Sequence, residues 1–227
     1  MVASIVIPAY NAARTIGRTI EACLAQEFPE GETEIIVVDD GSTDDTRSEI
    51  EKYPVTYLHQ QNAGPATARN TGWRAAQGEY VFFTDSDCVP ESNWVEGLLA
   101  GFTEDDIAAV GGSYSVMNPE SLVASCTQQE IMSRHERLPE HPRHLGTFNV
   151  CVRRSVLEDL GGLDETYPTA SVEDTELAYR IIKRGYRLAF RRDVKVGHFH
   201  PSRLWSFLRQ QFYGRTGGCA SASSTPT

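Results

Sequence analysis

ASIVIPAYN, residues 3–11, contains the first expected strand of this protein and the turn behind it. The run ASIVI is short, mostly apolar and rich in β-branched residues, a pattern typical of a strand that is buried on both faces of a sheet. Comparable runs follow at 34–38, 55–59 and 80–84, and stretches with helical spacing lie between them. This alternation predicts an α/β fold with a mostly parallel sheet and helices on both of its faces.

The strand and helix pattern loosens after residue 106 and predicts a smaller mixed region. We expect helices at 15–26, 43–52, 65–77, 90–102, 119–134, 172–184 and 204–212. We expect strands at 3–7, 34–38, 55–59, 80–84, 107–116, 147–153 and within 187–199. Residues 1–216 are therefore predicted to form one domain. Residues 217–227, rich in Gly, Ala, Ser and Thr, are predicted to be a flexible tail.

Composition excludes several classes of protein. The 227 residues carry a formal net charge of −10, which disfavours nucleic acid as a partner. No apolar run approaches the ~18 residues that a membrane-spanning helix needs. The five cysteines are odd in number and include no CxxC pair, so we expect neither a disulfide framework nor a cysteine zinc site. This cysteine usage predicts a cytoplasmic location.

Basic residues are concentrated near the carboxyl end of the chain. Residues 180–215 contain ten basic side chains and one acidic one. This excess indicates an anionic partner, either a phosphate-bearing ligand or a negatively charged membrane surface. The alternative is a solvated surface without a partner. Within this segment, 203–213 mixes aromatic and basic residues, and it either lies on a bilayer or packs onto the domain as a helix.

Polar turns follow the first four expected strands. They are PAYN at 8–11, DDGSTD at 39–44, NAGP at 62–65 and DSD at 85–87. Ligands of open parallel sheets bind beyond the carboxyl ends of the strands, so these turns are the expected binding edge. Neither GxGxxG after the first strand nor GxxxxGK[ST] is present. A nucleotide at this edge therefore needs side chains for its base and a metal for its phosphates.

Asp85 and Asp87 are the candidate metal ligands, because two carboxylates so close together suit Mg²⁺ or Mn²⁺. The alternative is an Asx-turn that caps the helix expected at 90–102. An EF-hand is disfavoured, since Pro90 occupies the position where such a loop has glycine.

Taken in order, these motifs resemble glycosyltransferase family 2. The resemblance covers about residues 3–200 and lies in Pro8–Asn11, Val37–Ser42, Ala68–Asn70, Asp85–Asp87, Gly146–Arg154, Gly161–Asp164 and Glu173–Asp174. The family implies a GT-A fold, a nucleotide-sugar donor, a divalent metal and usually inversion at the anomeric carbon. Residues 1–110 would then be the nucleotide-binding half and 111–216 the acceptor half.

The resemblance also implies roles for residues of the donor site. Pro8 and Tyr10 would line the nucleoside pocket, and Asp39 would accept a hydrogen bond from the base, which favours UDP. Arg69 would steady the nucleoside or a phosphate, and Asp85 would lie near the ribose and the metal. For Asp39 the alternative is a turn that leads into the next helix.

A late histidine completes the metal site in related GT-A enzymes. His198 fits that pattern better than His200, and a nitrogen ligand would favour Mn²⁺. The implied metal ligands are therefore Asp85, Asp87 and His198. The alternative is that both histidines lie on the surface at a strand end.

Asp174 is the candidate catalytic base, which would take a proton from an acceptor hydroxyl. It lies on the first turn of the helix expected at 172–184, where the helix dipole favours an anion. The alternative is a capping box with Ser171, since the sequence SVED fits that pattern. Glu173 would then share the capping role or contact the acceptor.

The family resemblance indicates a hexosyltransferase-type enzyme in cell-surface or exported glycan synthesis, with a glycan or lipid-linked acceptor. Such an acceptor would place the protein at the inner face of a membrane. Phe148 is bulkier than the residues usual there, which changes the expected acceptor pocket. The chain lacks a QxxRW motif, so a single sugar addition is favoured.

Two other functions fit parts of the sequence. Residues 81–89 resemble the strand and DxDx[TV] motif of haloacid-dehalogenase-like phosphatases, although no further motif of that class follows. A non-catalytic module that binds a nucleotide or a glycan is the second alternative, and it predicts donor binding without turnover.

Overall fold

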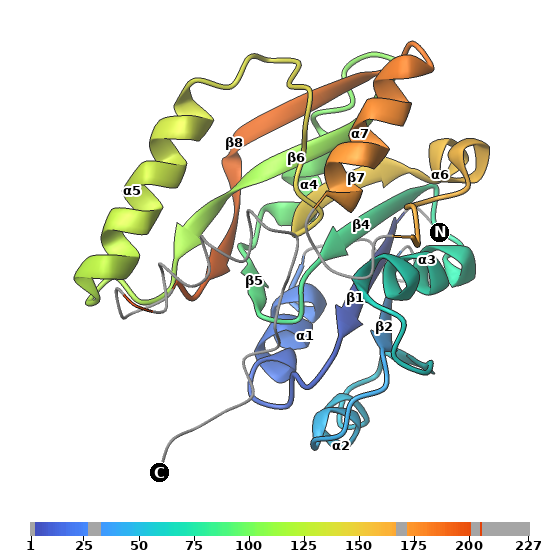
Figure 1. Cartoon of the computed structure of the whole chain (residues 1–227), viewed down its shortest axis with the longest axis vertical. Coiled ribbons are helices and arrows are strands. Elements are labelled where there is room, and N and C mark those ends of the chain that lie inside the picture. Colours follow the sequence, from blue (N-terminus) through green and yellow to red (C-terminus); the bar gives the residue numbers. More distant parts are fainter. Residues whose placement is uncertain (1–2, 27–32, 167–171, 201–204, 206–227) are drawn as a thin grey trace.

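One mixed sheet of eight strands forms the centre of the molecule (Figure 1). The structure is a computed structural model and describes residues 3–26, 33–166, 172–200 and 205. The strand order is β3-β2-β1-β4-β7-β6-β8-β5. The strands are β1 Ala3–Ala9, β2 Thr33–Asp39, β3 Thr56–His59, β4 Tyr80–Thr84, β5 Cys88–Pro90, β6 Ile107–Val116, β7 Asn149–Arg153 and β8 Arg187–His198.

The first four strands of the chain form a continuous parallel block, as the sequence predicts. β1 lies between β2 and β4 and pairs with both of them in parallel, and β2 pairs with β3 in the same sense. The pairs Ile5 with Ile35 and Val6 with Phe83 show the register. Beyond β4 the sheet becomes mixed, because β7 runs antiparallel to both β4 and β6. This is the mixed region that the looser sequence pattern predicts.

Helices cover both faces of the sheet. α1, α2 and α4 contribute to one apolar core, and α3, α6 and α7 contribute to the other. α5 lies against β6 at one side of the molecule (Figure 1). The helices are α1 Ile16–Leu24, α2 Thr46–Ile50, α3 Pro65–Ala75, α4 Trp94–Leu99, α5 Leu122–Glu136, α6 Arg154–Leu160 and α7 Glu173–Lys183.

Alternate residues of each central strand enter opposite cores, because successive side chains of a strand point to opposite faces. In β1, Ile5 and Ile7 belong to one core and Val6 to the other. Both faces of this strand are therefore dry, which is why its sequence reads as a continuous apolar run.

Two elements were not expected from the sequence. β5 has three residues, too few for any periodicity, and it forms because Cys88–Pro90 pairs with the end of β8. Pro90 therefore belongs to a strand, and the helix expected at 90–102 begins only at Trp94. α6 follows β7 without a break and ends at Gly161, whose φ of 76° is left-handed.

Several expectations concern residues outside the described part of the chain. These are the helix at 204–212, the bilayer contact of 203–213, the tail at 217–227 and the capping role of Ser171. Among the described helices, none combines the length and the apolar character that a membrane span requires.

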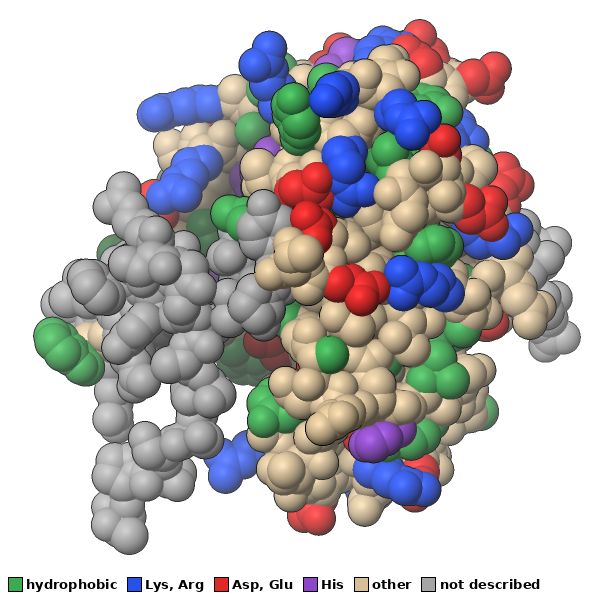
Figure 2. Space-filling view, turned by 45° about the vertical axis from the view of Figure 1, so that its right-hand side comes forward, with side chains coloured by type: hydrophobic (Ala, Val, Ile, Leu, Met, Phe, Trp, Pro, Cys, Tyr) green, Lys and Arg blue, Asp and Glu red, His purple; other side chains and the backbone are tan. Residues whose placement is uncertain are grey.

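Most described arginines of the basic segment have partners within the chain. Four of them pair with acidic side chains, and Arg192 donates to backbone carbonyls at the end of α5. Figure 2 accordingly shows basic and acidic side chains interleaved on one face of the molecule. The described part of the segment thus supports the alternative interpretation, in which the basic residues form an ordinary solvated surface. The four paired arginines are Arg180, Arg184, Arg187 and Arg191.

The close contact of α3 with the sheet predicts that Gly72→Ala destabilises the protein. An added Cβ would lie 2.3 Å from Cγ1 of Val6 and 3.2 Å from Cγ2 of Val38. Overpacking of this kind costs about 1–3 kcal/mol, which outweighs the ~1 kcal/mol that alanine gains in a helix. Urea unfolding should show the lower stability.

Gly17→Ala in α1 is the matched control. Its added Cβ would lie 2.8 Å from Oε1 of Glu49 and 2.9 Å from the Tyr53 hydroxyl, which are the far ends of two side chains and not branched methyls packed in the core. We expect this variant to lose less stability than Gly72→Ala. Equal destabilisation by both substitutions would contradict the packing argument.

Candidate active site

The candidate site lies at the sheet edge where the parallel strands end. Tyr10 follows β1, Asp39 is the last residue of β2, Asp85 follows β4 and His198 is the last residue of β8. β6 runs parallel to β8, so its end reaches the same edge, and antiparallel β7 begins there. The topology therefore brings residues from distant parts of the chain to one line, as the rule for open α/β sheets predicts.

Asp39 is buried and held by two hydrogen bonds. Its Oδ1 accepts from the backbone N of Ser42 at 2.8 Å, and its Oδ2 accepts from the Tyr57 hydroxyl at 2.8 Å. Burial and this hydrogen bond raise the pKa of Tyr57 to about 12. Each carboxylate oxygen keeps a further lone pair for a ligand. Tyr10, which directly follows β1 at the same edge of the sheet, is 45% exposed.

Asp40 has a structural role that the sequence analysis did not assign. Its two oxygens accept from the Gln60 side chain and from the backbone N of Ala63 and Gly64, at 2.7–2.9 Å. These bonds hold the loop between β3 and α3 against the end of β2. Of the two adjacent aspartates, Asp40 thus fixes this loop, and Asp39 is held by Ser42 and Tyr57.

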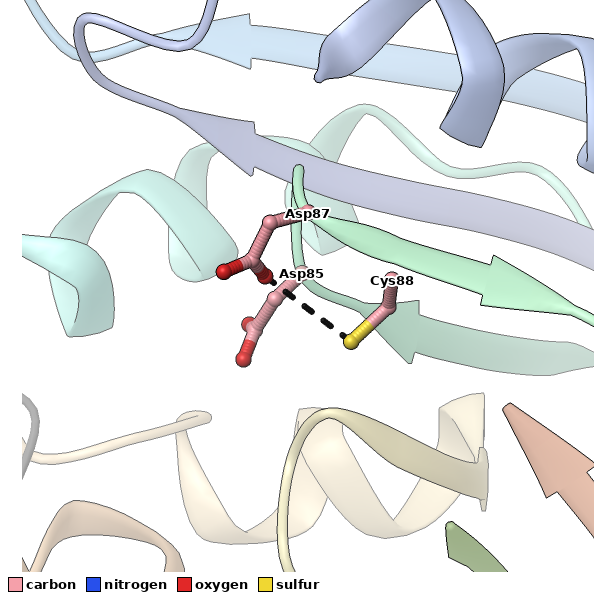
Figure 3. Close-up of side chains that lie close together, drawn as sticks. All are labelled: Asp85, Asp87 and Cys88. Atoms are coloured by element: carbon pink, nitrogen blue, oxygen red, sulfur yellow. Dashed lines mark hydrogen bonds between the residues drawn. The ribbon is translucent and has the colours of Figure 1, made fainter. Parts of the chain in front are cut away.

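Asp85 and Asp87 lie side by side on the turn between β4 and β5 (Figure 3). One ligand atom from each, together with Sγ of Cys88, lies within 4.8 Å of the others. The hydroxyl of Thr19 in α1 donates to the backbone O of Ser86 at 3.1 Å and holds this turn. Burial raises the pKa of the Cys88 thiol well above its usual range, so the two carboxylates are the hard donors.

The Asx-turn alternative for Asp85 and Asp87 is wrong. α4 begins at Trp94 with Asn93 as its N-cap, and β5 separates the acidic turn from that helix. The two carboxylates therefore do not cap α4.

His198 joins this acidic pair because β5 pairs with β8. Cys88 lies opposite His198 in the ladder, and Nε2 of His198 is 3.5 Å from Oδ2 of Asp87. Burial lowers the pKa of His198, but the Asp87 carboxylate raises it more, so it is raised overall. Nδ1 of His198 is buried without a hydrogen-bond partner among the described residues. Two carboxylates and one imidazole fit Mn²⁺.

His200 is buried beside His198 and serves the structure. Its ring binds the Gln128 side chain at 2.9 Å, and burial followed by the charge of His198 lowers its pKa to about 4. The alternative of two surface histidines is therefore wrong, since His200 is buried and the side chain of His198 is only 21% exposed.

Arg69 connects the acidic turn to α7. Its Nη2 lies 2.6 Å from Oδ1 of Asp85, and its Nη1 lies 3.2 Å from Oε1 of Glu173. Arg69 and Glu173 are each 3% exposed. Arg69 thus joins two parts of the site. It pairs with Asp85 on the turn after β4 and with Glu173 on the first turn of α7. The sequence analysis named all three residues but not this link.

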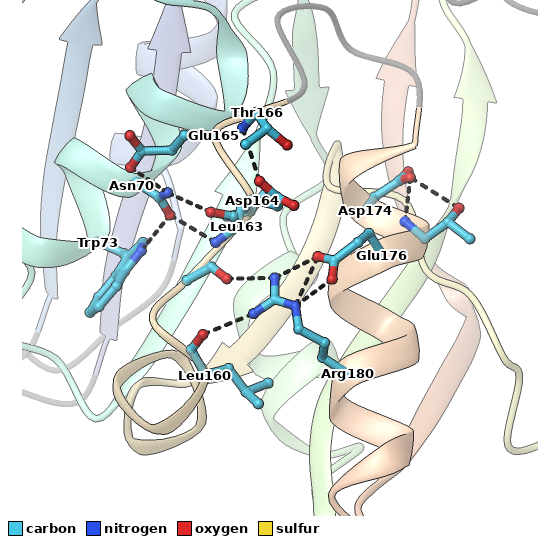
Figure 4. A network of polar contacts seen from close by, with 12 residues as sticks. Asn70, Trp73, Leu160, Leu163, Asp164, Glu165, Thr166, Asp174, Glu176 and Arg180 are labelled. Carbon is cyan, nitrogen blue, oxygen red and sulfur yellow. Dashed lines mark hydrogen bonds and ion pairs between the residues drawn. The ribbon is translucent and has the colours of Figure 1, made fainter.

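Asp174 is half-buried on the first turn of α7, next to Glu173. Its Oδ1 accepts from the backbone N of Thr175 at 2.6 Å and from the Thr175 hydroxyl at 3.2 Å (Figure 4). Its side chain also lines an apolar cavity of about 20 Å³, roughly the space of one water molecule. Burial, with a smaller effect of Glu173, raises the pKa of Asp174 above its usual value.

Tyr114 lies beside His198, with ring centroids 5.6 Å apart. Burial raises its pKa well above the usual range, and the charges of Cys88, Asp85, Asp87 and Asp174 add to that effect. The Tyr114 ring stacks on Phe148 with centroids 3.7 Å apart, so the bulky Phe148 fills the wall of the site. Nothing in the sequence pattern singled out Tyr114.

Asn70 and residues 161–165 belong to a structural network (Figure 4). The Asn70 amide bonds both backbone groups of Leu163 at 2.8 and 2.9 Å. Gly162 has a φ of 83°, and an added Cβ would lie 2.4 Å from Oδ1 of Asn70. The motifs Ala68–Asn70 and Gly161–Asp164 therefore fasten the segment before α7 to α3.

Comparisons with known proteins identify the family to which the fold and motifs point. The model of the family described as glycosyl transferase family 2 matches residues 4–161. The chain is 29% identical over 219 residues to glycosyltransferase AglE of Haloferax volcanii, covering 92% of this chain and 70% of that protein. It is 27% identical over 184 residues to UDP-Glc:α-D-GlcNAc-diphosphoundecaprenol β-1,3-glucosyltransferase WfgD of Escherichia coli, covering 79% and 69% of the two chains.

A solved structure shares the fold over most of this chain. It is a mannosyltransferase of Pyrobaculum calidifontis in complex with GDP-Man and Mn²⁺, with a TM-score of 0.74 and 25% identity. The match covers 92% of this chain and 60% of the mannosyltransferase. Against other relatives, this chain spans about half of their length.

The buried position of Arg69 predicts that Arg69→Met is strongly destabilising. The substitution removes the cation that pairs with Asp85 and with the buried Glu173, and breaking a buried ion pair typically costs about 3–5 kcal/mol. Urea unfolding measures this loss, and Glu173→Gln in the same chain should recover part of it, because one of the two negative charges that faced the guanidinium is then gone.

Arg74→Met provides the matched control on the same helix. Its ion pair with Glu165 has side chains 51% and 39% exposed, so its loss should cost under ~1 kcal/mol. If the two methionine variants were equally stable, Arg69 would not hold the site together.

Proposed function

This chain belongs to glycosyl transferase family 2, and on that premise we propose that it transfers a hexose from a nucleotide-sugar donor to an acceptor hydroxyl with inversion at the anomeric carbon. One observation carries the proposal. The carboxylates of Asp85 and Asp87 lie next to His198, and a separate half-buried carboxylate, Asp174, lies on the first turn of α7, which Arg69 ties to Asp85 through Glu173. The first group could hold a cation for a donor diphosphate, and the second suits an acceptor hydroxyl.

The proposed donor is a UDP-sugar. Asp39 is held by Tyr57 and Ser42 with lone pairs to spare, so it can accept the N3–H of uracil. Pro8 and the exposed Tyr10 would line the nucleoside pocket. The relative WfgD carries UDP-Glc in its name. The mannosyltransferase was solved with GDP-Man, so guanine nucleotides belong in the same test.

Asp85, Asp87 and His198 are the residues proposed to hold a divalent cation. The clustered oxygens of Asp85 and Asp87, with Nε2 of His198 3.5 Å from Oδ2 of Asp87, fit Mn²⁺, with Mg²⁺ as the alternative. When bound, such a cation neutralises charge on the leaving diphosphate. Arg69 would affect the donor through Asp85, whose orientation it fixes.

Asp174 is the proposed base. It would take the proton of the acceptor hydroxyl while the acceptor oxygen attacks the anomeric carbon and the nucleoside diphosphate leaves from the opposite side. Its raised pKa makes it a better proton acceptor than an ordinary aspartate.

For the acceptor, the proposal names a class of molecule. Residues 1–110 would bind the nucleotide and 111–216 the acceptor. A glycan or a lipid-linked sugar is the proposed acceptor, with WfgD as the relative whose name includes a diphosphoundecaprenol. A lipid-linked acceptor would bring the enzyme to a cytoplasmic membrane face. The phosphatase reading loses support, since the family match spans residues 81–89. The non-catalytic module is an outcome of the next test.

We expect Asp174→Asn to lower the transfer rate about 10²–10⁴-fold and to leave donor affinity nearly unchanged. Asp87→Ala should instead weaken donor binding and its dependence on metal. A thermal-shift panel of UDP-glucose, UDP-N-acetylglucosamine and GDP-mannose with Mn²⁺ or Mg²⁺ selects the donor, and release of its nucleotide measures turnover.

Asp193→Asn is the control, because Asp193 is exposed and paired with Arg191 away from the site. It should leave both properties unchanged. Wild-type turnover in Asp174→Asn would refute the base assignment, and donor binding without any turnover would favour the non-catalytic module.

The raised pKa of Asp174 predicts how activity depends on pH. The base must be ionised, so kcat/KM should fall as the pH falls through the Asp174 pKa, which lies above the ~3.9 of an ordinary aspartate. A raised folded pKa also means that ionised Asp174 destabilises the fold at neutral pH. Asp174→Asn should therefore raise the melting temperature at pH 7 and have less effect at pH 4. A lower melting temperature of this variant at pH 7 would contradict the assignment.

A further inference from the structure

His144 makes a contact with the first turn of α7 that the function proposed above does not use. Its Nδ1 lies 3.3 Å from the Thr175 hydroxyl, and that hydroxyl lies 3.2 Å from Oδ1 of Asp174. The three side chains form a series of two contacts that runs from the loop before β7 to the proposed base. His144 and Thr175 are both exposed.

When Asp174 is ionised, only one assignment of donors and acceptors allows both contacts to be hydrogen bonds. A carboxylate can only accept, so the Thr175 hydroxyl must donate to Asp174. The hydroxyl oxygen then accepts from His144, whose Nδ1 must carry a proton. Asp174 thus receives two bonds from Thr175, one from the backbone N and one from a hydroxyl that His144 orients.

The backbone that carries His144 is fixed by its neighbour. Leu145 is buried and packs against Gly111 of β6, where an added Cβ would lie 2.5 Å from Cδ2 of Leu145. The same leucine lines the apolar cavity beside Asp174. The loop therefore holds His144 next to a fixed residue, within reach of the Thr175 hydroxyl.

The surroundings of Asp174 act on its ionised form in opposite directions. Burial beside the apolar cavity disfavours it, as does the charge of the neighbouring Glu173 on the same helix. His144 and the two Thr175 hydrogen bonds favour it. From the sheet, the Tyr114 phenol is neutral, since burial raises its pKa well above the usual range.

We propose that His144, acting through the Thr175 hydroxyl, is a positioning residue that keeps Asp174 ionised and oriented toward the acceptor. The inference rests on the function proposed above, in which Asp174 is the base. It adds to that function a pair of exposed residues, His144 in the loop before β7 and Thr175 on α7.

Carboxyl-carbon NMR of protein labelled at aspartate tests the proposal without any substrate. The signal of Asp174 is the one that disappears in Asp174→Asn. Its titration midpoint should move to higher pH in His144→Ala and in Thr175→Val, because each removes a group that favours the carboxylate. Thr175→Ser keeps the hydroxyl and should restore the wild-type midpoint.

Turnover of the donor chosen by the thermal-shift panel provides the second readout. A hydrogen bond to a charged group corresponds to about tenfold or more in rate, so kcat of Thr175→Val should fall by about that factor at unchanged donor KM. His144→Asn places an amide donor near the position of Nδ1 and should retain more activity than His144→Ala. Melting temperatures verify that each variant is folded.

The outcomes separate this inference from the proposed function. Equal midpoints in the wild type, His144→Ala and Thr175→Val overturn the positioning role, even if Asp174→Asn is inactive. Shifted midpoints together with an active Asp174→Asn overturn the base assignment, and with it the positioning of a base. Shifted midpoints with reduced kcat and an inactive Asp174→Asn support both.

Discussion

The buried guanidinium of Arg69 is the contact on which the arrangement of the site depends. It holds Asp85, on the turn after β4, and Glu173, on the first turn of α7, within one ion-paired group. Burial makes this group sensitive, because a charge that loses its partner away from water costs several times more than an exposed one. Arg69 thereby also positions two further residues. They are Asp87, which lies beside Asp85 in the proposed metal site, and Asp174, the proposed base, which follows Glu173.

The sheet supplies the second constraint. β4 is central, so the acidic turn at its end is flanked by β1 on one side and by β7 on the other. β5 then turns back along β8 and brings His198 to Asp87. Three residues of β-ladder thus decide whether a histidine more than one hundred positions away can join the carboxylates.

The sequence predicted the parts of this protein that follow from local patterns. The buried runs of β1 to β4 and the polar turns behind them identified the fold and the positions of Asp39, Asp85 and Asp87. β5 escaped because three residues carry no periodicity, and its pairing with β8 is a long-range event. Tyr114, His144 and the link from Arg69 to Glu173 escaped for the same reason, since each acts through contacts between distant segments.

Asp174 shows why the site needs support from outside its own helix. A base must be desolvated enough to hold a proton and yet be ionised before the reaction starts, and these two demands oppose each other. The apolar cavity beside α7 meets the first demand. The helix start, Thr175 and His144 meet the second, from the exposed side. Surface residues therefore set the balance between the protonated and ionised forms of Asp174. Substitutions of these residues can change the pKa of the proposed base without disturbing Arg69 or the core.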